Sequence, residues 1–256
     1  SRYTRHLFPF YSWKHCIPET SCKVNGGLSN EHVASDGVID SVYDHENNAY
    51  AVVQIGNQCW MRENLKTTHY FDGEAIALGT VSDTSSAYRY YPNNNSAYVN
   101  TYGYLYNWKA AMKSSSCSDA APSGVQGACP TGYHIPSDNE WNQLFSYVES
   151  MSSYQCGEAE ENIAKALAST NNWSGSVAPC AIGNDLAINN VPGFSALPPG
   201  SFVSDSYGND VGARLFLWST SESSAEKANY QFFFYNNANI TTGNKNKSSA
   251  FSVRCL

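Results

Sequence analysis

The eight cysteines of this 256-residue chain limit its possible folds more than any other feature. Their number is even, none lies in a Cys-x-x-Cys pair, and no histidine is spaced from them as in a zinc site. Such usage is typical of structural disulfides that form in an oxidising compartment. Proximity along the chain favours three pairs and leaves a fourth, which gives Cys16–Cys22, Cys117–Cys129, Cys156–Cys180 and Cys59–Cys255.

The polar surface relies on amides and hydroxyls more than on charge. Charged residues make up 14% of the chain, the net charge is −7, and the basic residues form no cluster. The electrostatic footprint of a nucleic-acid-binding protein is therefore missing. No apolar run reaches the roughly 20 residues of a membrane-spanning helix. Because the chain starts without Met, we expect that a signal peptide or leader was removed and that the protein is extracellular or on the outer cell surface.

The sequence predicts an N-terminal arm, residues 1–41, and one domain, residues 42–256. The arm is too short to bury a core of its own, so we expect it to lie against the domain or against a neighbouring subunit. It carries a cluster of aromatic residues that makes it a candidate for assembly: Tyr3, Phe8, Phe10, Tyr11 and Trp13.

Hydrophobic periodicity predicts an α+β domain. The clearest helix follows Pro136, because Ser137 and Glu140 have the spacing of a capping box. The next apolar residues recur at helical spacing and predict one buried stripe, Trp141, Leu144, Phe145 and Val148. Shorter helices are predicted over 104–112 and 159–168. Strands are predicted over 49–55, with a turn at 46–48 before it, and over 216–219, 230–235 and 250–255.

Several phrases occur in the order typical of one family: IGNQCWMRENL (55–65), YGYLYNW (102–108), CPTGYHIPSDNEW (129–141), GFSALP (193–198), LWSTSE (217–222) and FSVRC (251–255). Over residues 42–256 the chain resembles the Fibrobacter succinogenes major paralogous domain. The resemblance implies the superfold of C-type lectins and formylglycine-generating enzymes, with small antiparallel sheets, two or three helices and long loops. It also implies an extracytoplasmic protein of Bacteroidota or Fibrobacterota type, and no established activity.

Catalytic signatures are missing. Formylglycine-generating enzymes use a copper-binding pair of thiols near the C-terminus, and here no cysteine lies between Cys180 and Cys255. HExxH, GxSxG, P-loop and GxGxxG motifs are also absent. We therefore expect no enzyme and no cofactor. Structural calcium is a weak alternative, because a loop that carries Asp205, Asn209 and Asp210 offers oxygen ligands but is more often a plain turn.

The segment 218–247 is the candidate ligand-binding region, as it is in related lectin-like folds. Alternation along its strand places aromatic residues on both faces, and a second aromatic face indicates cover by the arm, a partner or a ligand. Ordinary solvated hairpins over core aromatics are the alternative. The candidates are Trp218, Glu222, Gln231, Phe233, Tyr235, Asn237, Asn239, Asn244 and Asn246.

These features predict a non-catalytic module for binding or adhesion to a glycan or protein. A structural subunit of an extracellular fibre or pilus, assembled through the arm, is the second hypothesis, and a formylglycine-generating-like enzyme is the third.

Overall fold

The computed structural model describes residues 31–33, 39–159, 161–208 and 210–256, with only the backbone for 31–33 and 39. The aromatic cluster of the arm and the expected Cys16–Cys22 disulfide lie outside these residues. β2 spans residue 42, at which the sequence places the start of the domain, and β1 precedes it.

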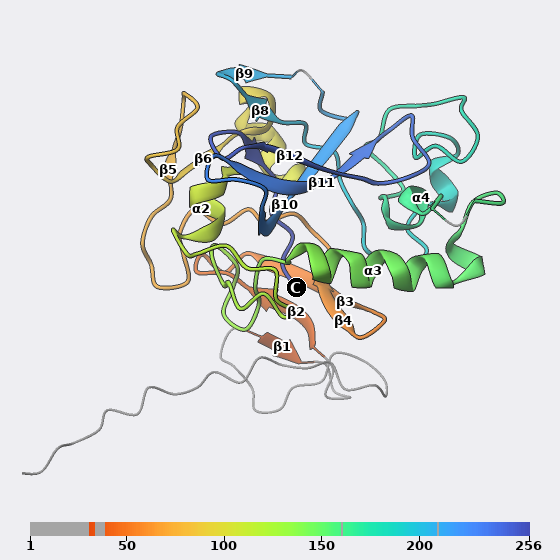
Figure 1. Ribbon diagram of the computed structural model, residues 1–256, viewed down its shortest axis with the longest axis horizontal. Helices are drawn as coiled ribbons and strands as arrows, with labels where there is room; N and C mark the ends of the chain where they lie inside the picture. Colours follow the sequence, from red (N-terminus) through yellow and green to blue (C-terminus); the bar gives the residue numbers. More distant parts are fainter. Residues whose placement is uncertain (1–30, 34–38, 160, 209) are drawn as a thin grey trace, which may run out of the picture.

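Three small sheets and a few helices form the described part of the chain, so the architecture is α+β (Figure 1). The first sheet is an antiparallel meander of β1 (Glu31–Val33), β2 (Ile39–Tyr43), β3 (Ala49–Ile55) and β4 (Gln58–Met61). A second antiparallel sheet contains β10 (Arg214–Glu222), β11 (Lys227–Phe234) and β12 (Thr241–Asn246). The third sheet is built, in spatial order, from β5 (Ala77–Leu78), β6 (Tyr88–Tyr90), β7 (Leu105–Asn107), β13 (Ala250–Phe251), β8 (Phe202–Val203) and β9 (Ser206–Tyr207).

The helices are short apart from one. They are α1 (Val99–Tyr102), α2 (Trp108–Met112), α3 (Asp138–Ser150) and α4 (Ala164–Leu167), with 3-10 turns η1 (Pro92–Asn94), η2 (Ser96–Tyr98), η3 (Ser152–Tyr154) and η4 (Leu186–Ile188). α3 lies between the first sheet and the β10–β12 sheet (Figure 1). Its buried side chains pack with Trp60 of β4, Leu217 of β10 and Phe233 of β11 in one core cluster.

The capping box predicted for α3 is confirmed. Ser137 Oγ accepts a hydrogen bond from the Glu140 backbone N–H at 3.2 Å, and Glu140 Oε2 accepts one from the Ser137 backbone N–H at 3.0 Å. Trp141, Leu144 and Val148 are fully buried, and Phe145 packs at the edge of the same core. Periodicity and the cap together thus placed this helix correctly.

Replacing Ser137 by alanine should lower the free energy of unfolding by about 1–2 kcal/mol, the usual cost of a lost helix cap. Ser137 is fully buried, and its hydroxyl also donates to the Ala120 carbonyl at 2.6 Å. Urea denaturation followed by far-ultraviolet circular dichroism measures the change. Ser150→Ala at the exposed other end of α3 is the matched control and should change stability by less than about 0.5 kcal/mol.

Other predicted elements are only partly correct. The segment 104–112 is a strand, β7, followed by the short helix α2, because Asn107 ends the strand and caps the helix through its side chain. The helix predicted over 159–168 is limited to α4. The strand predicted over 250–255 ends at Phe251. The residues after it form single backbone hydrogen bonds with other segments, such as the one that the Met61 N–H donates to the Cys255 carbonyl.

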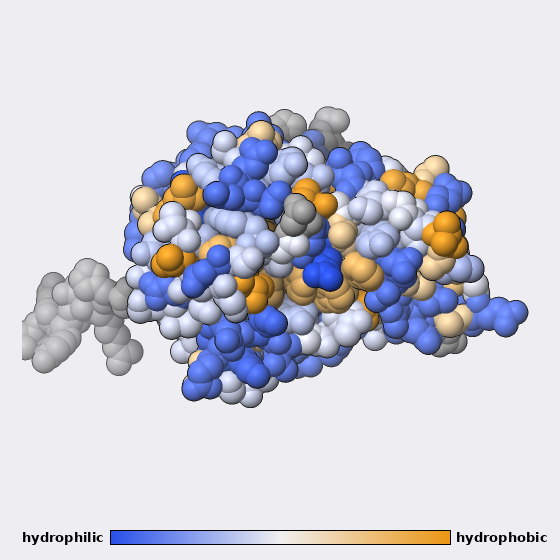
Figure 2. Space-filling model, turned by 90° about the horizontal axis from the view of Figure 1, so that it is seen from above, coloured by the Kyte–Doolittle hydropathy of each residue, from blue (hydrophilic) through white to orange (hydrophobic). Residues whose placement is uncertain are grey.

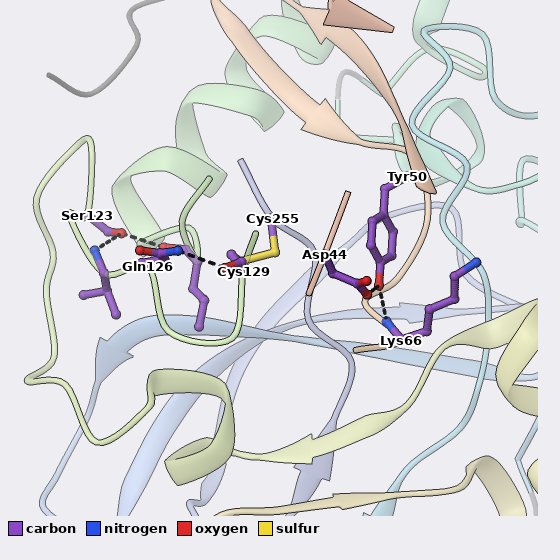
Figure 3. The surroundings of a disulfide bond; sticks show 9 residues. Asp44, Tyr50, Lys66, Ser123, Gln126, Cys129 and Cys255 are labelled. Carbon is purple, nitrogen blue, oxygen red and sulfur yellow. Dashed lines mark hydrogen bonds between the residues drawn. A yellow bond between two sulfur atoms is a disulfide. The ribbon is translucent and has the colours of Figure 1, made fainter. Parts of the chain in front are cut away.

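Two of the predicted disulfides are wrong and one is confirmed. Cys129 pairs with Cys255, not with Cys117, and Cys156 pairs with Cys180 as expected. Cys117 is a free, exposed thiol, while Cys59 is disulfide-bonded but not to Cys255. The C-terminal segment explains the change, because Leu256 and His134 exchange both backbone hydrogen bonds, at 2.8 and 2.9 Å, and so bring the chain end beside Cys129 (Figure 3).

Candidate binding surface

The two faces of the β10–β12 sheet pack against different core clusters, and we call the face toward α3 the inner face and the opposite one the outer face. Its register pairs Leu215 with Phe233 and Leu217 with Gln231, and these four side chains are buried on the inner face. Successive side chains of a strand point to opposite faces, so the residues between them lie on the outer face. Aliphatic residues on β10 therefore pair with the more deeply buried face of β11, while on the outer face Trp218 is fully buried and Tyr230 packs against the second core cluster.

The outer face carries a row of partly exposed aromatic rings. Phe216 stacks on Phe251 and on Phe232, with ring centroids 4.6 Å apart in both pairs. Phe232 stacks in turn on Phe234 at 6.1 Å. We call Phe216, Tyr230, Phe232 and Phe234 the aromatic row. Figure 2 views the molecule from the side on which β8, β9 and β12 lie in Figure 1, and a hydrophobic band crosses the middle of that face.

Polar and basic residues flank the aromatic row. The Arg214 guanidinium lies 5.6 Å from the Phe234 ring centroid, and Lys245 stands exposed on the neighbouring strand β12. Gly243 is opposite Tyr230, and a Cβ there would lie 2.7 Å from the Tyr230 hydroxyl oxygen, so the tyrosine ring covers this glycine. A side chain at position 243 would displace the ring.

Three of the predicted binding residues are in the core. Trp218 and Phe233 are fully buried, and the Trp218 Nε1 donates to the Tyr106 carbonyl at 2.8 Å. Gln231 is 1% exposed and accepts a hydrogen bond from Thr242 Oγ1 at 2.7 Å. These side chains have no surface to offer a ligand.

The remaining predicted residues are at the surface but do not form one site. Tyr235 is partly buried against the inner core, and the Asn237 carbonyl accepts from the Ile182 backbone N–H at 3.1 Å. Asn239 lies in the turn before β12 and is exposed. Glu222 pairs with Lys247, whose hydrogen bond lowers the pKa of the carboxyl, and Glu222 in turn raises the pKa of the Cys117 thiol.

Asn244 and Asn246 are exposed on the inner-face side of β12. Asn244 is opposite Asn229, whose side-chain amide donates to Asp138 of α3 at 2.7 Å. These two asparagines therefore lie on the other side of the sheet from the aromatic row. The residues of the row are not among the predicted binding residues, because alternation identifies two faces of a strand without saying which one is covered.

Asp205 and Asp210 of the candidate calcium loop each bind other groups of the protein. The Asp210 carboxylate accepts from the Ser201 backbone N–H at 3.2 Å and lies 3.5 Å from Arg214, while Asp205 binds the Ser82 backbone N–H. Asn209 lies outside the described residues. Within the described ranges, no group of three or more His, Cys, Asp or Glu side chains is placed to hold a metal ion.

The buried His134–Glu140 pair supports α3. His134 Nε2 lies 2.7 Å from Glu140 Oε1, and Glu140 Oε2 accepts from the Ser123 and Ser137 backbone N–H groups. Both side chains are nearly inaccessible to solvent. The pair therefore holds the loop before α3 on the first turn of the helix. No helix among the residues with described positions is long and apolar enough to cross a membrane.

A model of the Fibrobacter succinogenes major domain matches residues 53–256, which contain the aromatic row and the Cys129–Cys255 and Cys156–Cys180 disulfides. The chain belongs to this family. The match confirms the resemblance carried by the sequence phrases, and it begins inside β3, so that the β10–β12 sheet lies wholly within the family domain. No curated protein and no solved structure matches the chain. Disulfides such as Cys129–Cys255 and Cys156–Cys180 are typical of proteins that mature in an oxidising compartment.

Proposed function

We propose that the chain is a non-catalytic extracellular binding module and that the aromatic row is its ligand-binding surface. One observation carries the proposal: the outer face of the β10–β12 sheet leaves four neighbouring aromatic side chains partly exposed. Contiguous exposed aromatic area is typical of interaction sites. Aromatic residues flanked by arginine are also the side chains that contribute most to binding energy at interfaces.

The stacking of the row favours a protein ligand over a glycan. A pyranose ring packs on the free face of an aromatic ring, but Phe216 and Phe232 already stack on neighbouring rings. Ring edges remain, and these suit aliphatic and aromatic side chains of a protein, since aromatic pairs prefer edge-to-face or offset arrangements. Arg214 and Lys245 add positive charge, which favours a ligand with acidic residues nearby.

The C-type-lectin-like fold is part of the same proposal. We infer a C-type-lectin-like arrangement, in which the early and last segments of the domain lie side by side and late loops carry the ligand site. Backbone hydrogen bonds from Met61 to Cys255 and from Leu65 to Val253, at 3.0 and 2.9 Å, are consistent with it. So is the placement of the aromatic row on strands near the end of the chain.

The double variant Phe232→Ser/Phe234→Ser should weaken binding at least about tenfold, because an aromatic residue at an interface hot spot contributes about 2 kcal/mol or more and about 1.4 kcal/mol corresponds to tenfold. Both side chains are only partly buried, so the fold should tolerate the change. Arrays of purified extracellular proteins and of purified glycans, probed with the full chain, identify the ligand. Biolayer interferometry then measures the dissociation constant of each variant.

Asn244→Ser/Asn246→Ser is the matched control, since it alters two exposed residues on the opposite side of the same sheet. Its affinity should stay within about twofold of the unaltered chain. Equal loss in both variants, or no loss in the aromatic one, would overturn the assignment of the row. Binding only on the glycan array would overturn the preference for a protein ligand.

A further inference from the structure

The β10–β12 sheet has two edges, and backbone groups from elsewhere in the chain cover the one at β10. There the Gly200 N–H donates to the Arg214 carbonyl at 2.9 Å, and the Ser252 N–H donates to the Phe216 carbonyl at 3.0 Å. The Ser252 carbonyl accepts in turn from the Trp218 N–H at 3.1 Å. β12 is the last strand at the other edge, and among the described strands it pairs with β11 alone.

The bonds at the covered edge show how the rest of the sheet is bonded. In an antiparallel sheet, successive residues of a strand direct their N–H and C=O groups to opposite sides. Phe216 and Trp218 use theirs at the covered edge, so Leu217 between them bonds to its partner on β11, Gln231. The next residue of β11, Tyr230, therefore directs its N–H and C=O groups toward β12.

The free side of β12 presents unused backbone groups. Tyr230 is opposite Gly243, so Gly243 bonds to β11 and its two neighbours, Thr242 and Asn244, direct their N–H and C=O groups outward. Among the residues that the structure describes, none bonds to these outward groups, and both residues are exposed. A side-chain change such as Asn244→Ser leaves them in place. Such an edge can accept a further strand, which is one of the recurring modes of peptide recognition.

Charge along this edge favours an acidic segment. Lys245 is exposed and, unlike Lys247, which pairs with Glu222, it has no ion pair within the described ranges. A lysine on an edge strand hinders pairing with most other strands, whereas a carboxylate directly opposite the lysine stabilises the pair. Because Lys245 bonds to β11, it would form a non-hydrogen-bonded pair with an added strand, and in such pairs the side chains lie closest.

The neighbouring position favours an apolar residue. The Tyr230 ring covers Gly243, and Phe232 is opposite Thr241 on the same face of the sheet. A strand added to β12 would continue this outer face. Its side chain opposite Gly243 would therefore meet the Tyr230 ring, which suits an aromatic or β-branched residue.

We propose that the protein ligand adds an extended segment to β12 as an antiparallel strand, with an acidic residue opposite Lys245 and an apolar one, two residues later, opposite Gly243. Backbone hydrogen bonds to Thr242 and Asn244 supply affinity, and the two side chains supply selectivity. Both existing strand pairs of this sheet are antiparallel. The inference rests on the proposed function, because the added strand extends the face that carries the aromatic row.

Nuclear magnetic resonance of the isotope-labelled full chain with the capped peptide TETFTVT tests the proposal. Its glutamate would lie opposite Lys245 and its phenylalanine opposite Gly243. The amide signals of Thr242 and Asn244 should shift, and their hydrogen exchange should slow at least about fivefold at saturation. The dissociation constant should lie below about 1 mM. Absence of binding, or binding that leaves these two amides unchanged, would overturn the proposal.

Two modified peptides separate backbone pairing from side-chain contact. N-methylation of the two threonines that flank the phenylalanine removes the N–H groups directed at β12, so it should weaken binding at least about tenfold. N-methylation of the glutamate and the valine is the matched control, because their N–H groups face away from β12. The control should change the affinity less than about threefold. Equal affinity of the two modified peptides would contradict strand addition.

Reversing the charge of the lysine tests the acidic preference. Lys245→Glu should weaken binding of TETFTVT at least about threefold, and a peptide with lysine in place of the glutamate should then bind better than TETFTVT. Lys227→Glu makes the same change at an exposed residue on the other face of the sheet and should leave the preference unchanged. The same preference in Lys245→Glu as in the unaltered chain would rule out an acidic residue at this position.

Asn244→Pro distinguishes failure of strand addition from failure of the proposed function. It removes an outward N–H and leaves the bonds to β11 intact, which edge strands tolerate. It should therefore lose the peptide and the signal on the array of purified extracellular proteins, with an unchanged circular dichroism spectrum. An array signal lost in Phe232→Ser/Phe234→Ser but kept in Asn244→Pro would overturn strand addition alone. A signal lost in Asn244→Pro but kept in the double variant would support strand addition and overturn the role of the row.

Discussion

Replacing Arg254 by methionine is expected to lower the free energy of unfolding by about 3–5 kcal/mol, the cost of disrupting a buried, hydrogen-bonded charge. The Arg254 side chain is fully buried. Its Nη1 donates to the Met61 and Phe194 carbonyls at 3.0 and 2.6 Å, and its Nη2 donates to Asn64 Oδ1 at 2.7 Å. One side chain thus joins the end of β4, the loop at 194 and the last segment of the chain.

The guanidinium is held by neutral oxygens instead of a carboxylate. Burial lowers the pKa of Arg254, and the nearby charge of Glu63 acts in the opposite direction. The Phe194 ring, with its centroid 4.6 Å from the guanidinium carbon, adds a cation–π contact. Methionine fills much of the volume but leaves the carbonyl and amide acceptors without donors, and each unsatisfied buried acceptor costs about 1–3 kcal/mol. Relief of the buried charge offsets only part of that cost.

Guanidinium chloride denaturation, followed by tryptophan fluorescence, measures the effect of Arg254→Met. Arg214→Met is the matched control, because the Arg214 side chain is 46% exposed and its contact with Asp210 is 3.5 Å long. The control should change stability by less than about 1 kcal/mol. If Arg254→Met proves as stable as the control, the network around Arg254 does not hold the three segments together.

The role of Arg254 illustrates what periodicity could and could not predict. Alternation along FSVRC places Phe251, Val253 and Cys255 on one face and Arg254 on the other, which normally faces water. In the structure both faces are covered, because the segment runs between β4 and the loop at residue 194. A buried arginine next to a disulfide cysteine leaves no local signal. Its partners are carbonyl groups, which every residue carries.

Sequence patterns predicted the structure correctly where it depends on residues that are close together in the chain. The capping box and the buried apolar stripe of α3 depend on residues within one helix. The turn that precedes β3 likewise depends on residues close together in the chain. The faces of β11 depended on a different strand: only the register with Leu215 and Leu217 of β10 shows that Phe233 is inside. The same limit applies to a hollow of about 200 Å³ at the end of β2, since its lining residues Asp44, His69 and Cys129 lie far apart in the sequence.

Removing the Cys129–Cys255 disulfide by a double serine substitution should lower the free energy of unfolding by about 5 kcal/mol. In the chain-entropy description, a crosslink stabilises by restricting the unfolded chain, and the effect increases with the length of the closed loop. This bond joins residues 126 apart in sequence, whereas Cys156–Cys180 joins residues 24 apart. The corresponding loss for Cys156→Ser/Cys180→Ser is about 3.5 kcal/mol.

The two serine double variants therefore form an internally controlled pair, because each removes one disulfide from the same chain. Cys129 and Cys255 are also fully buried, so their serine hydroxyls need partners in the core, which adds to the loss. Chemical denaturation under non-reducing conditions should place the Cys129–Cys255 variant below the Cys156–Cys180 variant. If the Cys156–Cys180 variant were the less stable of the two, the disulfide in the segment after α3 would restrict the unfolded chain more than the disulfide at the chain end, contrary to this prediction.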